Sequence, residues 1–206
     1  MYGVVVPVKP PAVAKSRLAA LGDDVRRELC AAFAVDTVAA IVECRAVGEV
    51  LVVTDDVALA SVLAELGVVV IPDGVSGDLN GSLALGAAEV HRRRPELRIA
   101  AVFADLPALR PEELELALAA ASADGMSFVA DASGTGTTTV VAPSLELFHP
   151  AFGAQSREAH LAAGAYEILL DVPGLRQDVD TPEDLKVVLR LGAGPRTSFV
   201  ATRALQ

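Results

Sequence analysis

Acidic residues follow several apolar runs of the sequence, at the places where strands of a parallel sheet would end. Asp105 comes after the run AAVFA and before LPAL, where Pro107 lacks the donor that a hydrogen-bonded ladder requires. Asp178 and Asp180 occupy alternate positions of a short segment, so their side chains would share one face of an extended chain. Ligands of open α/β sheets bind outside the carboxyl ends of the strands. These three acids are therefore candidates for one shared site.

A cluster of carboxylates needs cations or hydrogen-bond donors, because an isolated buried carboxylate is costly. Oxygen ligands brought together from separate segments suit a hard cation, and we predict that Asp105, Asp178 and Asp180 hold Mg²⁺. The alternative is that these acids only cap helices or stabilise loops. That structural role is favoured for the other acids at strand ends, which are Asp55, Asp56 and Asp73.

Cations for such a site are found near the N-terminus, in VVPVKPPAVAKSRLAAL. This stretch has the strand, loop and helix order of a phosphate-binding segment, but its loop contains no glycine. Lys9, Lys15 and Arg17 could neutralise phosphate groups with charge, where a glycine-rich loop would offer backbone N–H groups. The alternative is an ordinary solvated loop.

Composition limits the possible functions further. The chain has 206 residues and a formal net charge of −10, which argues against a nucleic-acid partner because such proteins present a basic face. No apolar run reaches the roughly 18 residues of a membrane span, and the start lacks a signal-peptide pattern. We therefore expect no membrane partner and a cytoplasmic location, with Cys30 and Cys44 as reduced thiols.

Apolar runs alternate with helical patterns over the first 121 residues. Strands are expected at Tyr2–Val8, Glu49–Asp56, Gly67–Gly74 and Arg98–Leu109. Helices are expected at Asp23–Ile41, Val57–Leu66, Leu83–Arg93 and Arg110–Ala121. Such an alternation predicts a mainly parallel sheet with helices on both faces.

The pattern changes after Gly125. Met126–Pro143 reads as two strands around a Gly/Thr loop, and Leu175–Leu185 as a short strand followed by a helix capped by Thr181. The tail from about residue 192 is polar and irregular, and we expect it to be loose. No linker or repeat divides the chain, so we expect one domain over residues 1–206.

Five motifs resemble a known family over nearly the whole chain. VPVKPPAVAKSRL, ADLPAL, GTGTTT, HPAFGAQS and LRQDVDTPEDL occur in the order found in the phosphoenolpyruvate / 2-phospho-L-lactate guanylyltransferases of coenzyme F-420 biosynthesis, the CofC/FbiD family. The resemblance implies a single-domain, three-layer, Rossmann-like fold of the nucleotide-diphospho-sugar transferase type, with a mainly parallel mixed sheet. ADLPAL and DVDTPEDL are shared across that superfamily, whereas GTGT followed by FGxxS is specific to this family.

The resemblance also implies roles for individual residues. Asp105 and Asp178, with Asp180 adjacent, resemble the metal-coordinating acids, and Lys15 and Arg17 the basic residues that face the triphosphate. We assign Lys9 and Asn80 to nucleotide binding as well, with Asn80 near the guanosine. The positions that resemble the binding site for the phosphorylated three-carbon acid are Thr137 or Thr138, Gly153 and Ser156.

The implied reaction transfers GMP from GTP to phosphoenolpyruvate with Mg²⁺ as cofactor, and releases pyrophosphate. The acceptor phosphate is already anionic, so no protein base is required, and His91, His149 and His160 are not expected to be one. Three alternatives stay open: 2-phospho-L-lactate as acceptor, a sugar-phosphate or molybdopterin-type nucleotidyltransferase, and a non-catalytic GTP sensor. A homodimer is an expectation from fold analogy alone.

Overall fold

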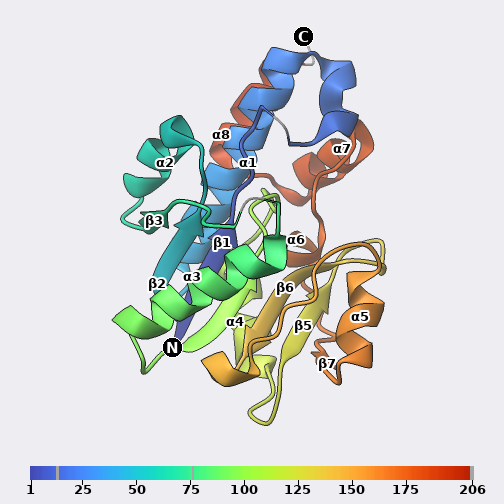
Figure 1. The fold of residues 1–206 in the computed structure, drawn as a ribbon. Coiled ribbons are helices and arrows are strands. Elements are labelled where there is room, and N and C mark those ends of the chain that lie inside the picture. Colours follow the sequence, from blue (N-terminus) through green and yellow to red (C-terminus); the bar gives the residue numbers. More distant parts are fainter. Residues whose placement is uncertain (13, 76, 205–206) are drawn as a thin grey trace.

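The computed structural model describes residues 1–12, 14–75 and 77–204, and Figure 1 shows its ribbon. The strands are β1 (Tyr2–Pro7), β2 (Val47–Val53), β3 (Val69–Ile71), β4 (Arg98–Val102), β5 (Ser127–Ala130), β6 (Thr137–Ala142) and β7 (Tyr166–Glu167). The α-helices are α1 (Asp23–Glu43), α2 (Val57–Ala64), α3 (Leu79–Arg93), α4 (Pro111–Ala120), α5 (Ser156–Ala162), α6 (Pro173–Arg176), α7 (Pro182–Leu191) and α8 (Pro195–Ala204). Two 3-10 helices are η1 (Ser16–Leu21) and η2 (Leu145–Leu147).

The described strands form one sheet in the order β3-β2-β1-β4-β6-β5-β7. β1 runs parallel to both β2 and β4, β2 is parallel to β3, and β5 is parallel to β7. β6 runs antiparallel to β4 and to β5, between which it is inserted. The sheet is thus mixed and mainly parallel, as predicted.

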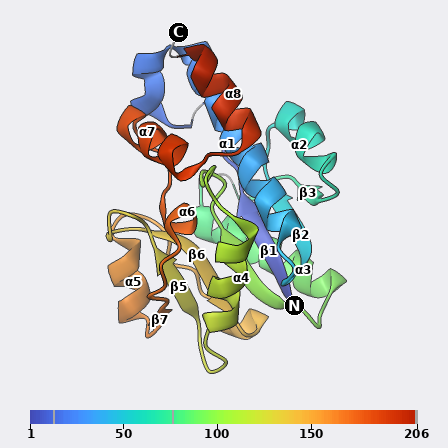
Figure 2. The same cartoon turned by 180° about the vertical axis from the view of Figure 1, so that it is seen from behind.

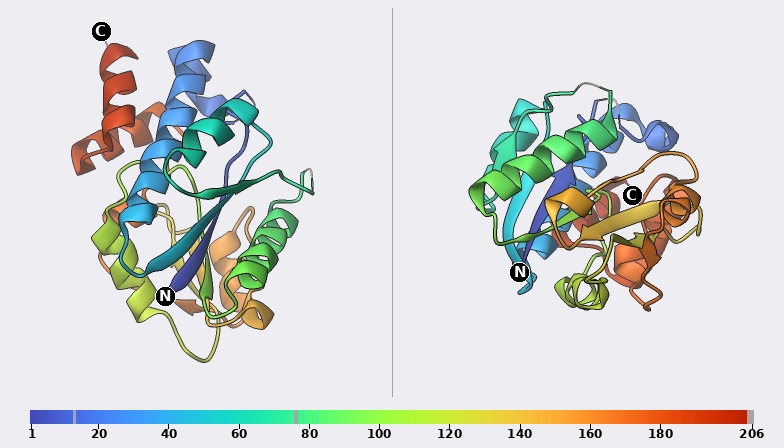
Figure 3. Two further views of the ribbon diagram at one scale, coloured as in Figure 1. Left: turned by 90° about the vertical axis from the view of Figure 1, so that its left-hand side faces the viewer. Right: turned by 60° about the horizontal axis from the view of Figure 1, so that its bottom comes forward.

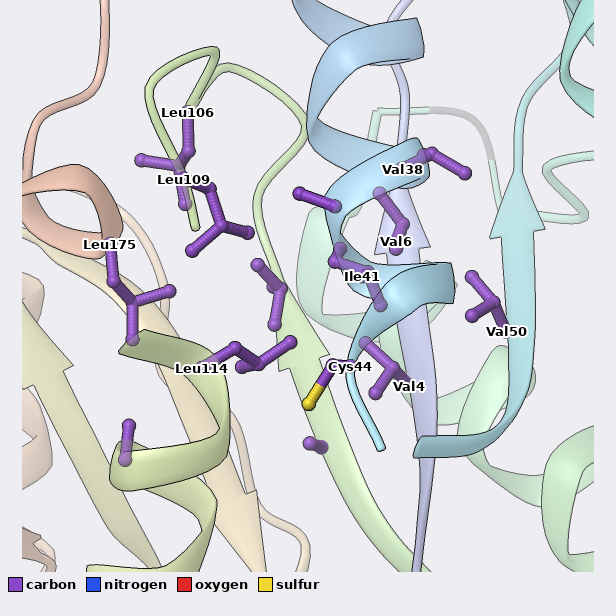
Figure 4. Packing of buried hydrophobic residues seen from close by; sticks show 14 of the residues in the cluster. Val4, Val6, Val38, Ile41, Cys44, Val50, Leu106, Leu109, Leu114 and Leu175 are labelled. Carbon is purple, nitrogen blue, oxygen red and sulfur yellow. The ribbon is translucent and has the colours of Figure 1, made fainter. Parts of the chain in front are cut away.

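Helices cover both faces of this sheet. α3 lies across the face seen in Figure 1, whereas α1 and α4 cover the face seen in Figure 2. The continuous apolar sequence of β1 follows from this, because Val4 and Val6 point into one core cluster and Val5 into the other, all fully buried. Figure 4 shows the first cluster, where Val4 and Val6 pack against Val38 and Ile41 of α1. The three-layer prediction is confirmed.

A third apolar cluster lies beyond the carboxyl ends of the strands. It joins the first half of α1 to η1, α7 and α8, and includes Leu18, Phe33, Val188 and Ala201. Figure 3 (left) shows α8 beside α1, both extending past the strands. This cluster therefore borders the carboxyl ends of the strands, which is where α/β sheets bind their ligands.

The expectation of a loose tail is wrong, because Pro195–Ala204 forms α8. Its first turn is capped by a distant residue: the Asp36 carboxylate of α1 accepts hydrogen bonds from the backbone N–H of Arg196 (3.2 Å) and of Thr197 (2.7 Å). The chain approaches Asp36 closely at Gly194, where a Cβ atom would collide with the Asp36 side chain. The cap and the apolar contacts with α1 together stabilise the tail.

The expected strand before α7 is also absent from the sheet. Residues 177–181 are extended but belong to no strand, and the backbone N–H of Val179 donates to the carbonyl of Asp105 at 3.1 Å. α3 begins at Leu79, four residues earlier than predicted, with Asp78 as its N-cap. In the described part of the chain, no helix combines the length and apolarity that crossing a membrane would need.

Candidate active site

A pocket of about 460 Å³ opens at the carboxyl ends of β1 and β4. It is lined by Lys9 and Lys15 of the loop between β1 and η1 and by Arg17 at the start of η1. It is also lined by Asp105, from the loop after β4, together with Asp178 and Asp180. The pocket therefore joins the basic loop and the three acids that the sequence analysis singled out.

The three acids form a compact cluster. One carboxylate oxygen from each of Asp105, Asp178 and Asp180 lies within 4.8 Å of the others. The hydrogen bond from the N–H of Val179 to the Asp105 carbonyl holds the segment of Asp178 and Asp180 against the loop after β4. The capping box of Thr181 and Asp184 then starts α7 and ends the segment.

Lys15, at the start of η1, contacts this cluster directly. Its ammonium group forms an ion pair with Asp105 and another, at 2.5 Å, with Asp180. The side chain of Lys15 is 15% exposed, whereas that of Arg17, 3.8 Å from Asp180, is 74% exposed. Lys15 is thus an interior cation of the site and Arg17 lies at its rim.

Burial and charge shift the pKa values of two of these groups. Burial alone would lower the pKa of Lys15, but the carboxylates of Asp105 and Asp180 raise it above its ordinary value, so Lys15 is charged. Burial, together with repulsion from the Asp105 carboxylate, raises the pKa of Asp178 to about 7. A further cation beside Asp178 would therefore favour its charged form.

The donor set fits a divalent cation. Asp105 uses Oδ2 for Lys15, whereas its buried Oδ1 has no hydrogen-bond partner among the described residues. An unpartnered buried carboxylate oxygen is costly unless a cation or donor reaches it. Three carboxylates from two segments of the chain, one of them with an unpartnered oxygen, offer the oxygen ligands that a hard cation prefers.

The loop that carries Lys15 is held by Arg26, a buried residue of α1. The guanidinium group of Arg26 donates to the backbone carbonyls of Pro11 (2.8 Å), Ala12 (3.1 Å) and Ala14 (2.5 Å). Lys15 itself adopts a left-handed backbone conformation, with φ of 55°. Sequence reasoning missed Arg26, since an arginine at a helix start gives no sign that it will bind a loop.

Asn80 has a structural partner in the loop before α5. Its side-chain amide donates to the backbone carbonyl of Phe152 at 3.0 Å, and its side-chain oxygen accepts from the N–H of the same residue at 2.9 Å. Phe152 stacks on Phe103, which lines the pocket, with ring centroids 4.5 Å apart. Asn80 therefore joins the start of α3 to the loop before α5; its expected contact with guanosine stays a prediction.

The three consecutive threonines of β6 have distinct environments. A bulge in the pairing with β5 places Thr139 opposite Val129 and Thr137 opposite Ala130, and leaves Thr138 unpaired in that register. The Thr138 hydroxyl donates to the carbonyl of Leu175 at 2.7 Å. Both Thr137 and Thr138 are buried, and neither lines the pocket around the acids.

Thr137 is instead linked to His160 of α5, whose ring Nδ1 lies 3.0 Å from the Thr137 hydroxyl. The other ring nitrogen of His160 accepts the N–H of Ala151 at 3.0 Å, so this network assigns the proton to Nδ1. Burial lowers the pKa of His160, which is therefore neutral at pH 7. This histidine organises a loop; His91 and His149 do not line the pocket either.

Gly153 and Ser156 follow Phe152 on the same loop. Gly153 has a φ of 148°, in the region that favours glycine, and Ser156 is buried at the start of α5. Like Thr137, they do not line the pocket around the acids; the Phe103–Phe152 stack connects their loop to it. The structure thus gathers the predicted basic and acidic residues in one pocket and places the predicted acceptor residues outside it, in β6 and around the start of α5.

Comparison with known proteins identifies the family. Residues 2–200 match the family described as "Guanylyl transferase CofC like". The chain belongs to this family. A phosphoenolpyruvate guanylyltransferase from Streptomyces coelicolor is 55% identical over 207 residues, which cover 99% of this chain and 97% of the relative. One from Thermomonospora curvata is 50% identical, covering 98% of this chain and 89% of the relative.

Solved structures support the same fold for this CofC-like guanylyl transferase. A protein from Desulfovibrio desulfuricans G20, assigned to the nucleotide-diphospho-sugar transferases, aligns with a TM-score of 0.69 at 15% identity, over 98% of this chain and 95% of that one. A nucleotidyl transferase from Methanothermobacter aligns with a TM-score of 0.62 at 19% identity, over 93% and 97%. The family resemblance and the fold type predicted from the sequence are both confirmed.

Proposed function

We propose that this guanylyl transferase moves GMP from GTP to the phosphate of phosphoenolpyruvate, giving enolpyruvyl-diphospho-5′-guanosine and pyrophosphate, as a step of coenzyme F-420 biosynthesis. The names of the full-length relatives support the acceptor. The observation that carries the proposal is the pocket in which Lys15 faces Asp105, Asp178 and Asp180. The two buried free thiols agree with a reducing, cytoplasmic location.

The chemistry asks for charge neutralisation and positioning rather than proton transfer. A phosphate oxygen of the acceptor attacks the α-phosphorus of GTP; the new P–O bond forms as the bond to the β-phosphate breaks and pyrophosphate leaves with the electron pair. The attacking oxygen is already anionic, so the reaction needs no general base, and no histidine lines the described pocket. The barrier is the approach of two polyanions, which fixed positive charge lowers.

We assign the divalent cation to Asp105, Asp178 and Asp180, and take it to be Mg²⁺. When bound, Mg²⁺ would polarise phosphate oxygens and neutralise charge that develops on them. The protein's part is to present the three carboxylates together and to hold them in place through Val179 and the start of α7. The fit rests on the unpartnered Oδ1 of Asp105 and on the separation of the three oxygens.

The loop between β1 and η1 would bind the triphosphate. Lys9, Lys15 and Arg17 all line the pocket, and their charge is needed because the whole chain carries −10. Arg26 holds the backbone of this loop through three carbonyls, so the cations act from a fixed support. The side-chain charges of this loop would thus bind the phosphates that a glycine-rich loop binds in other proteins with its backbone N–H groups.

The acceptor would bind beside Phe103, near Thr137 at the start of β6 and near Gly153 and Ser156 where the chain enters α5. Because Nδ1–H of His160 donates to the Thr137 oxygen, the hydroxyl hydrogen of Thr137 is left to donate to an anion. The hydroxyl hydrogen of Thr138 is already used on Leu175. Thr137 is therefore the better candidate of the two for contact with the acceptor.

The test is to incubate the purified protein with GTP and Mg²⁺ and with either phosphoenolpyruvate or 2-phospho-L-lactate, then to measure pyrophosphate release and the guanosine-linked product. We expect a higher kcat/KM with phosphoenolpyruvate. A preference for 2-phospho-L-lactate would overturn the acceptor assignment alone, and turnover with neither would overturn the proposed function.

A further inference from the structure

The Lys15 ammonium group occupies the space between two of the three acids. It contacts Asp105 through Oδ2 and Asp180 through Oδ1, and its side chain is mostly buried. A divalent cation binds carboxylate oxygens at about 2.1 Å, so one held by these same two oxygens would lie where the ammonium group is. The two cations exclude each other by volume and repel each other by charge.

The acidic cluster also has more capacity than Lys15 uses. Asp105 Oδ1 is buried and has no partner among the described residues, and Asp178 makes no ion pair with Lys15. One ammonium group thus pairs with two of the three carboxylates and leaves other carboxylate oxygens of the cluster without a cation. An ion pair whose purpose was only to stabilise the fold would not need the third acid or leave a buried oxygen unpaired.

The geometry of the loop allows Lys15 to leave without unfolding it. Arg26 holds the carbonyls of Pro11, Ala12 and Ala14, so the backbone before Lys15 is anchored independently of the acids. Lys15 starts η1 with a left-handed backbone, and its side chain borders the same pocket as Lys9 and Arg17. Rotation of the side chain alone would move the ammonium group from the acids into that pocket.

We infer that Lys15 is a built-in counter-ion of the acidic cluster, which a divalent cation must displace from Asp105 and Asp180 in order to bind. The displaced ammonium group then faces the pocket, where a polyphosphate is its natural partner. Metal and nucleotide therefore bind cooperatively, because the nucleotide offers the displaced lysine a new partner, and the coupling is reciprocal. This inference rests on the metal site of the proposed function.

The first test measures Mn²⁺ binding without nucleotide, by calorimetry or electron paramagnetic resonance, to the full chain and to two variants. Lys15→Met removes the competing ammonium group. Lys9→Met removes an equal charge from the same loop, but from an exposed lysine that makes no ion pair in the described structure, and so measures the general effect of charge. We expect Lys15→Met to bind Mn²⁺ at least tenfold more tightly than the unmodified chain, and Lys9→Met to differ from it less than threefold.

The possible outcomes distinguish the displacement of Lys15 from the proposed metal site on which it rests. Equal Mn²⁺ affinity in Lys15→Met and Lys9→Met would overturn the displacement of Lys15 while leaving the metal site standing. Absence of Mn²⁺ binding in all three proteins, with circular dichroism showing them folded, would overturn both.

A second test needs no substitution and so stands even if Lys15→Met fails to fold. The chain has three lysines, and Lys186 of α7 has an exposed side chain that pairs with Glu183 and not with the three acids of the cluster. Acetylation by an amine-reactive ester, followed by mass spectrometry, compares Lys15 with Lys186 in the presence and absence of Mg²⁺. We expect Mg²⁺ to raise the labelling rate of Lys15 at least fivefold and to leave that of Lys186 unchanged. An unchanged or lower rate at Lys15 would contradict its displacement.

Discussion

The side chain of Asn80 and the backbone of Phe152 are joined by two hydrogen bonds across 72 residues of sequence. They connect the start of α3, where Leu79 lines the charged pocket, to the loop that carries Gly153 and Ser156. Phe152 in turn stacks on Phe103 at the pocket wall. A single amide thus joins the helix that borders the charged pocket to the loop proposed to bind the acceptor.

Replacing Asn80 by Ala should lower the free energy of unfolding by about 1 to 3 kcal/mol, because both backbone groups of Phe152 lose their partner. The KM for the acceptor should rise more than the KM for GTP, since the loop that moves is the acceptor loop. Urea denaturation and steady-state kinetics measure the two effects. Asn80→Asp keeps the acceptor oxygen but not the donor, so its stability and its KM for the acceptor should lie between those of the unmodified chain and those of Asn80→Ala. A larger rise in the KM for GTP would instead support the guanosine contact.

Asp105→Asn should lower kcat by at least about a hundredfold, because the variant loses a charged ligand from the proposed metal site. The matched control is Asp56→Asn. Asp56 also follows a parallel strand, but it caps α2 through the N–H of Leu59, a role that asparagine performs equally well. Steady-state assays with circular dichroism test the pair. Near-normal turnover in Asp105→Asn would contradict the metal assignment.

The raised pKa of Asp178 predicts how stability depends on pH. Between its ordinary value of 3.8 and about 7, the folded protein keeps a proton that the unfolded chain releases. The stability associated with that proton is therefore complete at low pH and lost as the pH rises through about 7. Asp178→Asn, which resembles the protonated acid, should stabilise the metal-free protein at pH 8 by about 1 to 2 kcal/mol, after discounting for partial exposure, and at pH 5 by less than half of that amount.

Urea denaturation in EDTA at both pH values measures this difference, and Asp56→Asn reports the general effect of removing one negative charge. The prediction for Asp178 fails if the stability gain is the same at pH 5 and pH 8. In the loaded enzyme the same substitution should abolish turnover, so stability and activity move in opposite directions.

Isosteric substitution can distinguish the roles of Thr137 and Thr138. Thr138→Val should destabilise the fold by about 1 to 3 kcal/mol because the buried carbonyl of Leu175 loses its donor. Thr137→Val should destabilise the fold as well, because the buried Nδ1–H of His160 loses its acceptor, but it should raise the KM for the acceptor more strongly, because it removes the hydroxyl that His160 leaves free to donate. Kinetics and denaturation on both variants would show the contrast. The reverse pattern would assign the acceptor contact to Thr138.

The acidic cluster could be predicted from the sequence because its signal is local. A strand that ends in Asp105 and an extended segment with acids at alternate positions both point to the carboxyl edge of a parallel sheet. Lys15 could be predicted for a related reason, since its loop follows the first strand. The order of the strands could not be predicted in this way, because the insertion of β6 between β4 and β5 depends on pairing between distant segments.

Residues that act at long range gave no sequence signal. Asp36 lies within α1 and looks like an ordinary helical acid, yet it caps α8 some 160 residues later, which is why the tail is ordered. Arg26, Asn80 and His160 likewise serve backbone or hydroxyl groups of other segments. Their roles depend on which segments the fold brings together, and periodicity and composition do not contain that information.

The central claim is that an acceptor phosphate oxygen attacks the α-phosphorus of GTP in the pocket of Lys15, Asp105, Asp178 and Asp180. The most direct measurement follows phosphoenolpyruvate labelled with ¹⁸O in its phosphate, incubated with GTP, Mg²⁺ and the protein, stopped with EDTA and analysed by mass spectrometry. The account predicts that all label from consumed acceptor appears in the guanosine-linked diphosphate and that the pyrophosphate is unlabelled. Labelled pyrophosphate, or GTP consumed to GDP and orthophosphate, would contradict it.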